Sequence, residues 1–201
     1  MSRTTEDLQT AEISGASGWG SGGAVVWVTG ISGAGKTTVC DALANLVGDQ
    51  VPELVRIDGD VVREVFGAGL GYKAADREIQ IGRVQRLSRV LAEQGKLVLV
   101  AALYASDDLL SWNREHLPGY FEVYLEASFD LVRSRDPKGL YRKADAGQMP
   151  DVVGIDVPWN APKQPDLVID ASRPATPREH AISIARRIPR LSRVLTRLSL
   201  D

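Results

Sequence analysis

The stretch Gly30-Ile-Ser-Gly-Ala-Gly-Lys-Thr37 fits the pattern G-x-x-x-x-G-K-[ST], and the rest of the chain is best interpreted outward from it. Directly before it, the apolar run Ala24–Thr29 (AVVWVT) predicts a buried parallel strand. Directly after it, the periodicity of Lys36–Leu46 predicts a helix. A phosphate-binding loop lies between a strand and a helix, and both are predicted here. A glycine-rich turn that contains a lysine by chance is the alternative, but such a turn need not have a strand before it and a helix after it.

The residue types in this loop suit nucleotide phosphates. Its glycines let the backbone curl so that its N–H groups point inward, and the first turn of the next helix adds unpaired N–H donors. Lys36 supplies a positive charge for the β- and γ-phosphates, and the Thr37 hydroxyl is a ligand for Mg²⁺. The residues predicted to bind ATP here are Gly30, Ser32, Gly33, Ala34, Gly35, Lys36, Thr37 and Thr38.

Further strands are predicted to alternate with helices along the chain. Four more apolar runs predict strands at Leu54–Ile57, Lys96–Leu103, Phe121–Leu125 and Leu167–Ile169. A long helix is predicted at Arg77–Gln94 from apolar residues at spacings of three and four. This alternation is typical of an α/β fold with a central parallel sheet covered by helices on both faces. With the phosphate-binding loop it predicts a three-layer P-loop fold, which the acids and motifs described below narrow to a P-loop kinase fold.

The chain is predicted to hold one domain. Residues 1–23 are rich in Ser, Thr, Gly and acid without periodicity, which predicts a flexible leader before a single domain at 24–201. Residues 137–165 have prolines, glycines and mixed charge, which is typical of a functional lid or binding loop. Seven arginines follow Ala171 in an amphipathic tail. That tail is interpreted as a solvated face on a packing helix, or as a contact to an acidic partner or a second subunit in a homodimer.

The amino-acid composition bears on which partners and metals the protein is expected to bind. The 201 residues carry a formal net charge of −2, which gives no reason to expect nucleic acid or an anionic membrane as partner. No apolar run is long enough to span a bilayer, and no secretory signal is visible. Cys40 is the single cysteine, which excludes an internal disulfide and suits a reducing cytoplasm. The chain contains only two histidines, His116 and His180, in addition to this cysteine, so a zinc site is not expected.

Acidic residues after the second strand favour a kinase over other nucleotide-binding proteins. The strand Lys96–Leu103 has no carboxylate at its tip, where an ATPase commonly holds a magnesium-linked aspartate. Asp58 and Asp60 instead end the preceding strand, at the edge that faces the ligand crevice of an open α/β sheet. An acid there can accept the proton of an acceptor hydroxyl or hold Mg²⁺, although a simple polar turn is the alternative. Asp107 and Asp108 form a weaker candidate pair, and no N-K-x-D motif for guanine is present.

A set of further motifs resembles the adenylylsulfate kinase family over roughly residues 24–170. They are Gly30–Thr38, Asp58-Gly-Asp60 with Arg63, Leu70-Gly-Tyr72 with Asp76-Arg77, Arg135-Asp-Pro-Lys-Gly-Leu-Tyr141, Gly154-Ile-Asp156, Pro158, Ala161-Pro162 and Pro165-Asp166-Leu167. The D-P-K-G-L-Y motif followed by G-I-D is the specific part. The resemblance implies transfer of the ATP γ-phosphoryl group to the ribose 3′-hydroxyl of adenylylsulfate, with Mg²⁺.

The resemblance also implies roles for single residues. It makes Asp60 the general base, supported by Asp58, with Lys36 completing the catalytic set. Arg135 would join the ATP-binding residues at the start of the lid. The implied acceptor-binding residues are Arg63, Tyr72, Arg77, Gln80, Tyr104, Lys138, Val152 and Ile155. Among these, the two arginines would hold the phosphate side and Tyr72 would stack on the base.

Some positions depart from the family pattern. Val152 aligns with a phenylalanine that clamps the adenine, Gln80 with an asparagine, Gly82 with an arginine, and Ala102–Asp107 with F-I-S-P-Y-R. All are assigned to the acceptor pocket, where losing one aromatic face costs about 1–3 kcal/mol of stacking. Tyr104, Trp112-Asn-Arg114 and Val152-Val-Gly-Ile-Asp156 resemble related kinases that act on cytidine-diphosphate-linked acceptors such as cytidine diphosphoramidate. A non-nucleotide metabolite kinase and a catalytically silent nucleotide sensor are further alternatives.

Replacing Lys36 by Ala tests the phosphate-binding loop. Because the charge of Lys36 stabilises the transferring phosphoryl group more than the ground state, kcat should fall by about 10²-fold or more. Steady-state measurement of ADP release would detect this loss. Near-normal turnover of the Lys36→Ala variant would contradict the assignment of the loop.

Overall fold

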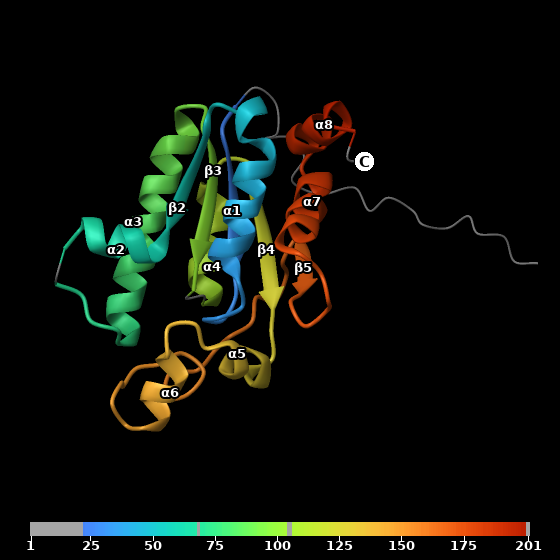
Figure 1. Cartoon of the computed structure of the whole chain (residues 1–201). Helices are drawn as coiled ribbons and strands as arrows, with labels where there is room; N and C mark the ends of the chain where they lie inside the picture. Colours follow the sequence, from blue (N-terminus) through green and yellow to red (C-terminus); the bar gives the residue numbers. More distant parts are fainter. Residues whose placement is uncertain (1–21, 68, 104–105, 200–201) are drawn as a thin grey trace, which may run out of the picture.

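Five parallel strands form the centre of the molecule (Figure 1). This computed structural model describes residues 22–67, 69–103 and 106–199. The predicted leader at 1–23 lies almost wholly outside the described residues, as does Tyr104. The strands are β1 (Ala24–Thr29), β2 (Leu54–Asp58), β3 (Leu97–Ala102), β4 (Tyr120–Glu126) and β5 (Leu167–Asp170), in the order β2-β3-β1-β4-β5. Each predicted strand is present to within one residue at each end.

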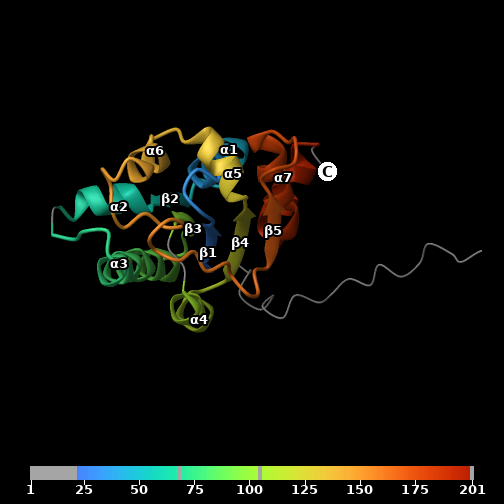
Figure 2. The same cartoon turned by 90° about the horizontal axis from the view of Figure 1, so that it is seen from below.

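Helices cover both faces of the sheet (Figure 2). They are α1 (Lys36–Val47), the short 3₁₀ turn η2 (Gly48–Gln50), α2 (Gly59–Val65), α3 (Ala74–Glu93), α4 (Asp107–His116), α5 (Phe129–Arg135), α6 (Leu140–Asp145), α7 (Pro177–Arg187) and α8 (Pro189–Arg197). One buried cluster joins the sheet to α1, α7 and α8, and a second joins it to α3 and the region of α4. The three layers confirm the α/β fold predicted from the sequence.

The central strand β1 shows why the chain folds in three layers. All six of its residues are buried, so it needs apolar cover on both sides. Val26 and Val28 belong to the cluster under α1 and α7, while Val25 and Trp27 belong to the cluster under α3. Successive side chains of a strand point to opposite faces, and a continuous apolar run therefore places β1 in the middle of the sandwich.

The strand order determines where a ligand can bind. β1 pairs with β3 on one side and with β4 on the other, so the connections that leave β1 diverge. In open α/β sheets a crevice forms at such a point, outside the carboxyl ends of the strands. The phosphate-binding loop leaves β1 at this edge. Asp58 ends β2 at the same edge, on the other side of β3 and level with Ala101.

The segment 137–165 is more ordered than its composition indicates. It contains the short helix α6, which begins after Gly139, and an isolated bridge between Val153 and Val157. The Asp156 carboxylate accepts the backbone N–H of Asp151 at 2.6 Å, which closes the turn before that bridge. Hydrogen bonds between side chains and backbone thus replace the apolar periodicity that this segment lacks.

The arginine-rich tail forms two helices divided at Pro189. Ile184, Ile188, Leu191 and Leu195 are fully buried in the cluster under α1. This agrees with the prediction that the tail packs through an apolar face. In the described part of the chain, no helix combines the length and the low polarity needed to cross a bilayer. A contact of this tail with an acidic partner or a second subunit stays a prediction.

The thiol of Cys40 should be unreactive in the folded protein. The side chain is 4% exposed in α1, and burial foremost raises the pKa of the thiol well above its usual range. Since the thiolate is the reactive form, labelling with a chromogenic disulfide reagent should be slow at neutral pH. The same reagent should titrate one thiol at once in concentrated guanidinium. Fast stoichiometric labelling without denaturant would contradict the packing of α1.

Candidate active site

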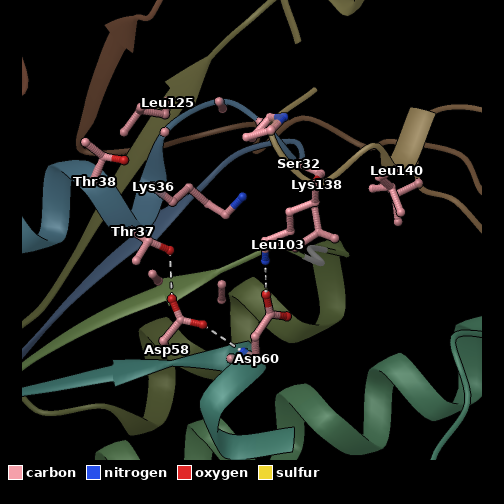
Figure 3. A pocket seen from close by; sticks show the side chains of 18 of the residues that line it. Ser32, Lys36, Thr37, Thr38, Asp58, Asp60, Leu103, Leu125, Lys138 and Leu140 are labelled. Carbon is pink, nitrogen blue, oxygen red and sulfur yellow. Dashed lines mark hydrogen bonds and ion pairs between the residues drawn. The ribbon is translucent and has the colours of Figure 1, made fainter. Parts of the chain in front are cut away.

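A large cavity opens at the carboxyl edge of the sheet (Figure 3). It has a volume of about 1220 Å³. Its walls come from the loop after β1, the turn after β2, α3, the segment between α5 and α6, and the start of α7. Among the predicted site residues of the described chain, all line it except Gly30 and Ile155.

The loop after β1 is curled as the sequence predicts. Gly33 and Gly35 have φ values of 81° and 101°, which residues with a side chain rarely adopt. The amine of Lys36 turns back and donates to the carbonyl oxygens of Gly30 at 2.8 Å and Ile31 at 3.0 Å. Burial lowers the pKa of Lys36 to about 8, although Asp60 and Asp58 act to raise it. Gly30 therefore contributes its carbonyl to the site without lining the cavity.

The first residues of α1 are joined directly to the end of β2. The Thr37 hydroxyl donates to one carboxylate oxygen of Asp58 at 2.7 Å. The other oxygen of Asp58 accepts the backbone N–H of Asp60 at 2.8 Å, which makes Asp58 the N-cap of α2. A hydroxyl and a carboxylate side by side are oxygen ligands that Mg²⁺ accepts together with water and phosphate oxygens. The pair Thr37 and Asp58 thus fits a magnesium ion.

Asp60 faces a lysine from a distant part of the chain. Lys138, in the turn between α5 and α6, donates to the Asp60 carboxylate at 2.7 Å (Figure 3). Both side chains are about three-quarters exposed, at 72% and 76%. The hydrogen bond to Asp60 is the main cause that raises the pKa of Lys138. Both residues line the cavity, and the ion pair joins the expected base to the expected lid.

The acceptor side is built around Tyr72. The guanidinium carbon of Arg63 lies 4.8 Å from the centre of the tyrosine ring, and that of Arg77 lies 5.6 Å from it. Arg77 also donates to the carbonyl of Tyr72 and to that of Asp151, both at 2.7 Å, and is 8% exposed. Arg63 donates to the carbonyls of Leu70 and Gly71. These cations hold the ring in place and leave it 47% exposed.

The remaining predicted acceptor residues divide into two groups. Gln80 and Val152 line the cavity, and both are buried. Ile155, which follows Gly154, is 43% exposed and does not line the cavity. Its role in acceptor binding stays a prediction, as does that of Tyr104.

Two of the departures from the family pattern were assigned to the wrong place. Gly82 does not line the cavity; it lies two residues after Gln80 on α3 and borders a shallow groove against α4. Residues two apart on a helix point in different directions, which explains the error. Asp107 is also outside the cavity, in the first turn of α4, where it pairs with Lys163.

Several lining residues were not predicted. The hydroxyl of Tyr141, which is 2% exposed, donates to the carbonyl of Ser32 at 2.9 Å and so ties α6 to the phosphate-binding loop. At the far end, Ala171, Ala175, Pro177 and His180 complete the wall beside Arg135, which donates to the carbonyl of Ala171 at 3.0 Å. Thr176 and Glu179 form a capping box that fixes the start of α7. The T-P-x-E sequence is a signal for that helix start.

Comparison with known proteins identifies the family. The model of the adenylylsulphate kinase family matches residues 22–170. The chain belongs to the adenylylsulphate kinase family. It is 39% identical to the adenylyl-sulfate kinase of Deinococcus deserti over 151 residues, which is 75% of this chain and 83% of that protein. It is 41% identical to the adenylyl-sulfate kinase of Chloroflexus aurantiacus over 145 residues, 72% of this chain and 78% of that protein.

A solved structure from the same family has the same P-loop kinase fold. The APS kinase of Mycobacterium tuberculosis, determined in complex with AMPPNP and APS, superposes with a TM-score of 0.77 at 32% identity. The superposition covers 85% of this chain and 99% of that one. The sequence resemblance over 24–170 is therefore confirmed at the level of the family. Ala171, Ala175, Pro177 and His180 lie beyond the part that the family model matches.

Replacing Asp60 by Asn tests the assignment of the base in this family member. If Asp60 accepts the proton of the acceptor hydroxyl, kcat should fall by about 10²–10⁴-fold while the protein still binds ATP. Asp107→Asn is the control, because Asp107 carries the same charge outside the cavity and should leave turnover nearly unchanged. Turnover and calorimetric ATP binding would be compared for both. A larger loss of kcat in Asp107→Asn than in Asp60→Asn would contradict this assignment and indicate that the general base lies on α4.

Proposed function

We propose that this protein transfers the γ-phosphoryl group of ATP to the ribose 3′-hydroxyl of adenylylsulfate. The observation that supports it is the arrangement of one cavity, with the phosphate-binding loop at its floor and Asp60 beside it on the acceptor side. Family membership supports the same reaction, because the relatives named above are adenylyl-sulfate kinases. The family member from M. tuberculosis was solved with an ATP analogue and with APS.

In this proposal ATP enters from the α7 side. Its phosphates follow the backbone N–H groups of the loop, and Lys36 exchanges the carbonyls of Gly30 and Ile31 for phosphate oxygens. Arg135, fixed on the carbonyl of Ala171, offers a flat cation against which the base stacks, with Pro177 and His180 on the same wall. Thr37 and Asp58 would hold Mg²⁺, which neutralises phosphate charge when bound.

The acceptor binds on the other side of the loop. Tyr72 offers the open part of its ring to the base, and Arg63 and Arg77 provide positive charge near it. Asp60 takes the proton of the 3′-hydroxyl as that oxygen attacks the γ-phosphorus atom, and ADP leaves. Lys138 must then give up its bond to Asp60, and its natural next partner is the phosphoryl group in transit. Residues 137–165 act as the lid that excludes water.

Adenylylsulfate is favoured over a cytidine-based acceptor. The comparisons are with adenylyl-sulfate kinases, and two of the departures that favoured a changed acceptor, Gly82 and Asp107, do not line the cavity. Val152 does line it but is 2% exposed and packed in the core, so it closes a wall and leaves no open space for a second ring. Retention of Lys36, Thr37 and Asp60 in one site argues against a silent sensor. We place the enzyme in the cytoplasm, where its single thiol stays reduced.

A coupled assay of ADP release tests this function. Adenylylsulfate should stimulate release more than cytidine diphosphate conjugates or simple nucleosides, by about tenfold or more in kcat/KM, since stacking of a base contributes about 1–3 kcal/mol. Mass spectrometry and phosphorus NMR of the product should locate the new phosphate on the 3′-oxygen. ADP release that no acceptor stimulates, or a clear preference for a cytidine conjugate, would refute the proposal.

A further inference from the structure

One face of β4 carries polar groups into the interior of the protein. Tyr120, Glu122 and Tyr124 are alternate residues of this strand, so their side chains share a face, and the residues between them belong to the cluster under α1. The Glu122 carboxylate is 1% exposed and accepts the hydroxyl of Tyr120 at 2.8 Å. Burial foremost raises the pKa of Glu122. A carboxylate buried in this way destabilises the fold unless donors and a cation compensate it.

The chain that returns from the proposed lid covers this face of β4. Residues 157–166, which we call the return limb, connect the lower part of the molecule, where α6 lies, to the start of β5 (Figure 1). Trp159 of the return limb packs near Tyr124, with ring centroids 6.3 Å apart. At its end the Asp166 carboxylate accepts the backbone N–H of Glu122 at 2.7 Å. The return limb thus follows β4 and brings a second carboxylate to Glu122.

Arg114 of α4 lies between the two carboxylates. Its guanidinium nitrogens are 3.4 Å from a carboxylate oxygen of Glu122 and 3.5 Å from one of Asp166. The same guanidinium group donates to the carbonyl of Gln164, and its carbon atom is 5.5 Å from the centre of the Tyr120 ring. The side chain is 35% exposed, so the cation is partly withdrawn from water. The planar fork of an arginine suits this place, because its nitrogens can meet several acceptors from one position.

We propose that Arg114 is a positioning residue that holds the return limb against β4 and thereby fixes the lid during phosphoryl transfer. The inference rests on the proposed function, in which residues 137–165 close over the substrates. Val157, at the start of the return limb, is bridged to Val153, which lines the cavity. The anchor at Arg114 therefore ends a short path of chain that begins in the cavity wall. Arg114 does not itself line the cavity, so in this proposal it acts only through the return limb.

Without Arg114 the two carboxylates would repel each other. Asp166 already acts to raise the pKa of Glu122, which reports that the two negative charges oppose one another. β4 is held in the sheet between β1 and β5, whereas the return limb contains neither helix nor strand. The return limb is therefore the part that would move away. A further contact of the return limb, the ion pair between Lys163 and Asp107, is largely exposed and contributes little to this anchor.

A matched pair of variants tests the positioning role. Arg114→Met keeps much of the length of the side chain and removes its charge. Arg190→Met is the control, because Arg190 is similarly enclosed, at 27% exposed, and forms an ion pair with Glu53, while neither of these two residues lines the cavity. Both variants lose an ion pair and should have a lower melting temperature than the wild type. Only Arg114→Met should change the lid.

Cleavage by trypsin after Lys163 reports the position of the return limb directly. The Lys163 side chain is 76% exposed, so cleavage there is limited by how often the backbone leaves its packed position. In Arg114→Met the fragment that begins at Gln164 should appear about tenfold faster or more than in the wild type, and in Arg190→Met within about twofold of the wild-type rate. Mass spectrometry identifies the fragment, and the measurement needs no substrate.

The consequence for the reaction appears in the ratio of ADP released to acceptor phosphorylated. A return limb that moves away lets water reach the γ-phosphoryl group, so this ratio should rise from about one in the wild type to about two or more in Arg114→Met. The KM for adenylylsulfate should rise by about tenfold, and Arg190→Met should keep both values within about twofold of the wild type. A loss of stability alone lowers the amount of active enzyme and leaves the ratio unchanged.

Two further variants separate charge from packing. Asp166→Asn, combined with Arg114→Met, removes one of the two facing negative charges and keeps an oxygen for the N–H of Glu122. The double variant should recover most of the slow cleavage and of the low ADP ratio that Arg114→Met loses, which is a non-additive result. Arg114→Lys keeps a positive charge and should fall between the wild type and Arg114→Met. It takes the place of Arg114→Met if that variant does not fold.

Four results would each overturn the inference. They are an unchanged rate of cleavage after Lys163 in Arg114→Met, an unchanged ratio of ADP to phosphorylated acceptor in that variant, equal changes in Arg190→Met, and no recovery in the double variant. The proposed function fails separately, if the wild-type protein does not phosphorylate adenylylsulfate. Cleavage after Lys163 uses no substrate, so it still decides whether Arg114 holds the return limb.

Discussion

The register of three neighbouring strands is the constraint on which the site depends. β3 pairs with both β2 and β1, so Asp58 stands level with Ala101 and Thr29 with Ala102. The turn after β2 and the loop after β1 therefore leave the sheet at the same edge and at matching positions along their strands, with β3 between them. This matching position allows the Thr37 hydroxyl to donate a hydrogen bond to the Asp58 carboxylate at 2.7 Å. A shift of one residue in this pairing would exchange the faces of β2 and separate the phosphate-binding loop from both acids.

Two lysines and two carboxylates face one another beside the phosphate-binding loop. Lys36 and Lys138 are the lysines, and Asp58 and Asp60 are the carboxylates. Lys36 is buried and turned onto backbone carbonyls, while Lys138 is bound to Asp60. A nucleotide triphosphate brings an excess of negative charge, which offers both lysines stronger partners. In the proposed reaction, ATP binding would draw Lys138 from Asp60 toward the phosphates and leave the Asp60 carboxylate open to the acceptor hydroxyl.

The sequence predicts the fold closely and the site in part. Short, mainly apolar runs locate all five strands. A strand that is buried on both faces needs apolar side chains on both, so its sequence is a continuous apolar run. The loop motif and the two acids of β2 follow from the same order of elements. The contact between Lys138 and Asp60 joins residues 78 apart and depends on how a segment without periodicity folds back. The misplacement of Gly82 had a simpler cause, since helix phase alone separates it from Gln80.

The segment proposed as the lid, residues 137–165, contacts the rest of the site through two hydrogen bonds of different strength. Tyr141 is buried and donates its hydroxyl to Ser32, so α6 is anchored to the phosphate-binding loop itself. Lys138 and Asp60 are both largely exposed, and an ion pair of that kind contributes about 0–1 kcal/mol. If this segment moves on substrate binding, we expect the buried hydrogen bond of Tyr141 to persist and the exposed ion pair to break. Since Tyr141 lies in the helix that directly follows Lys138, its hydrogen bond to Ser32 would link the arrival of ATP at the phosphate-binding loop to the proposed movement of Lys138.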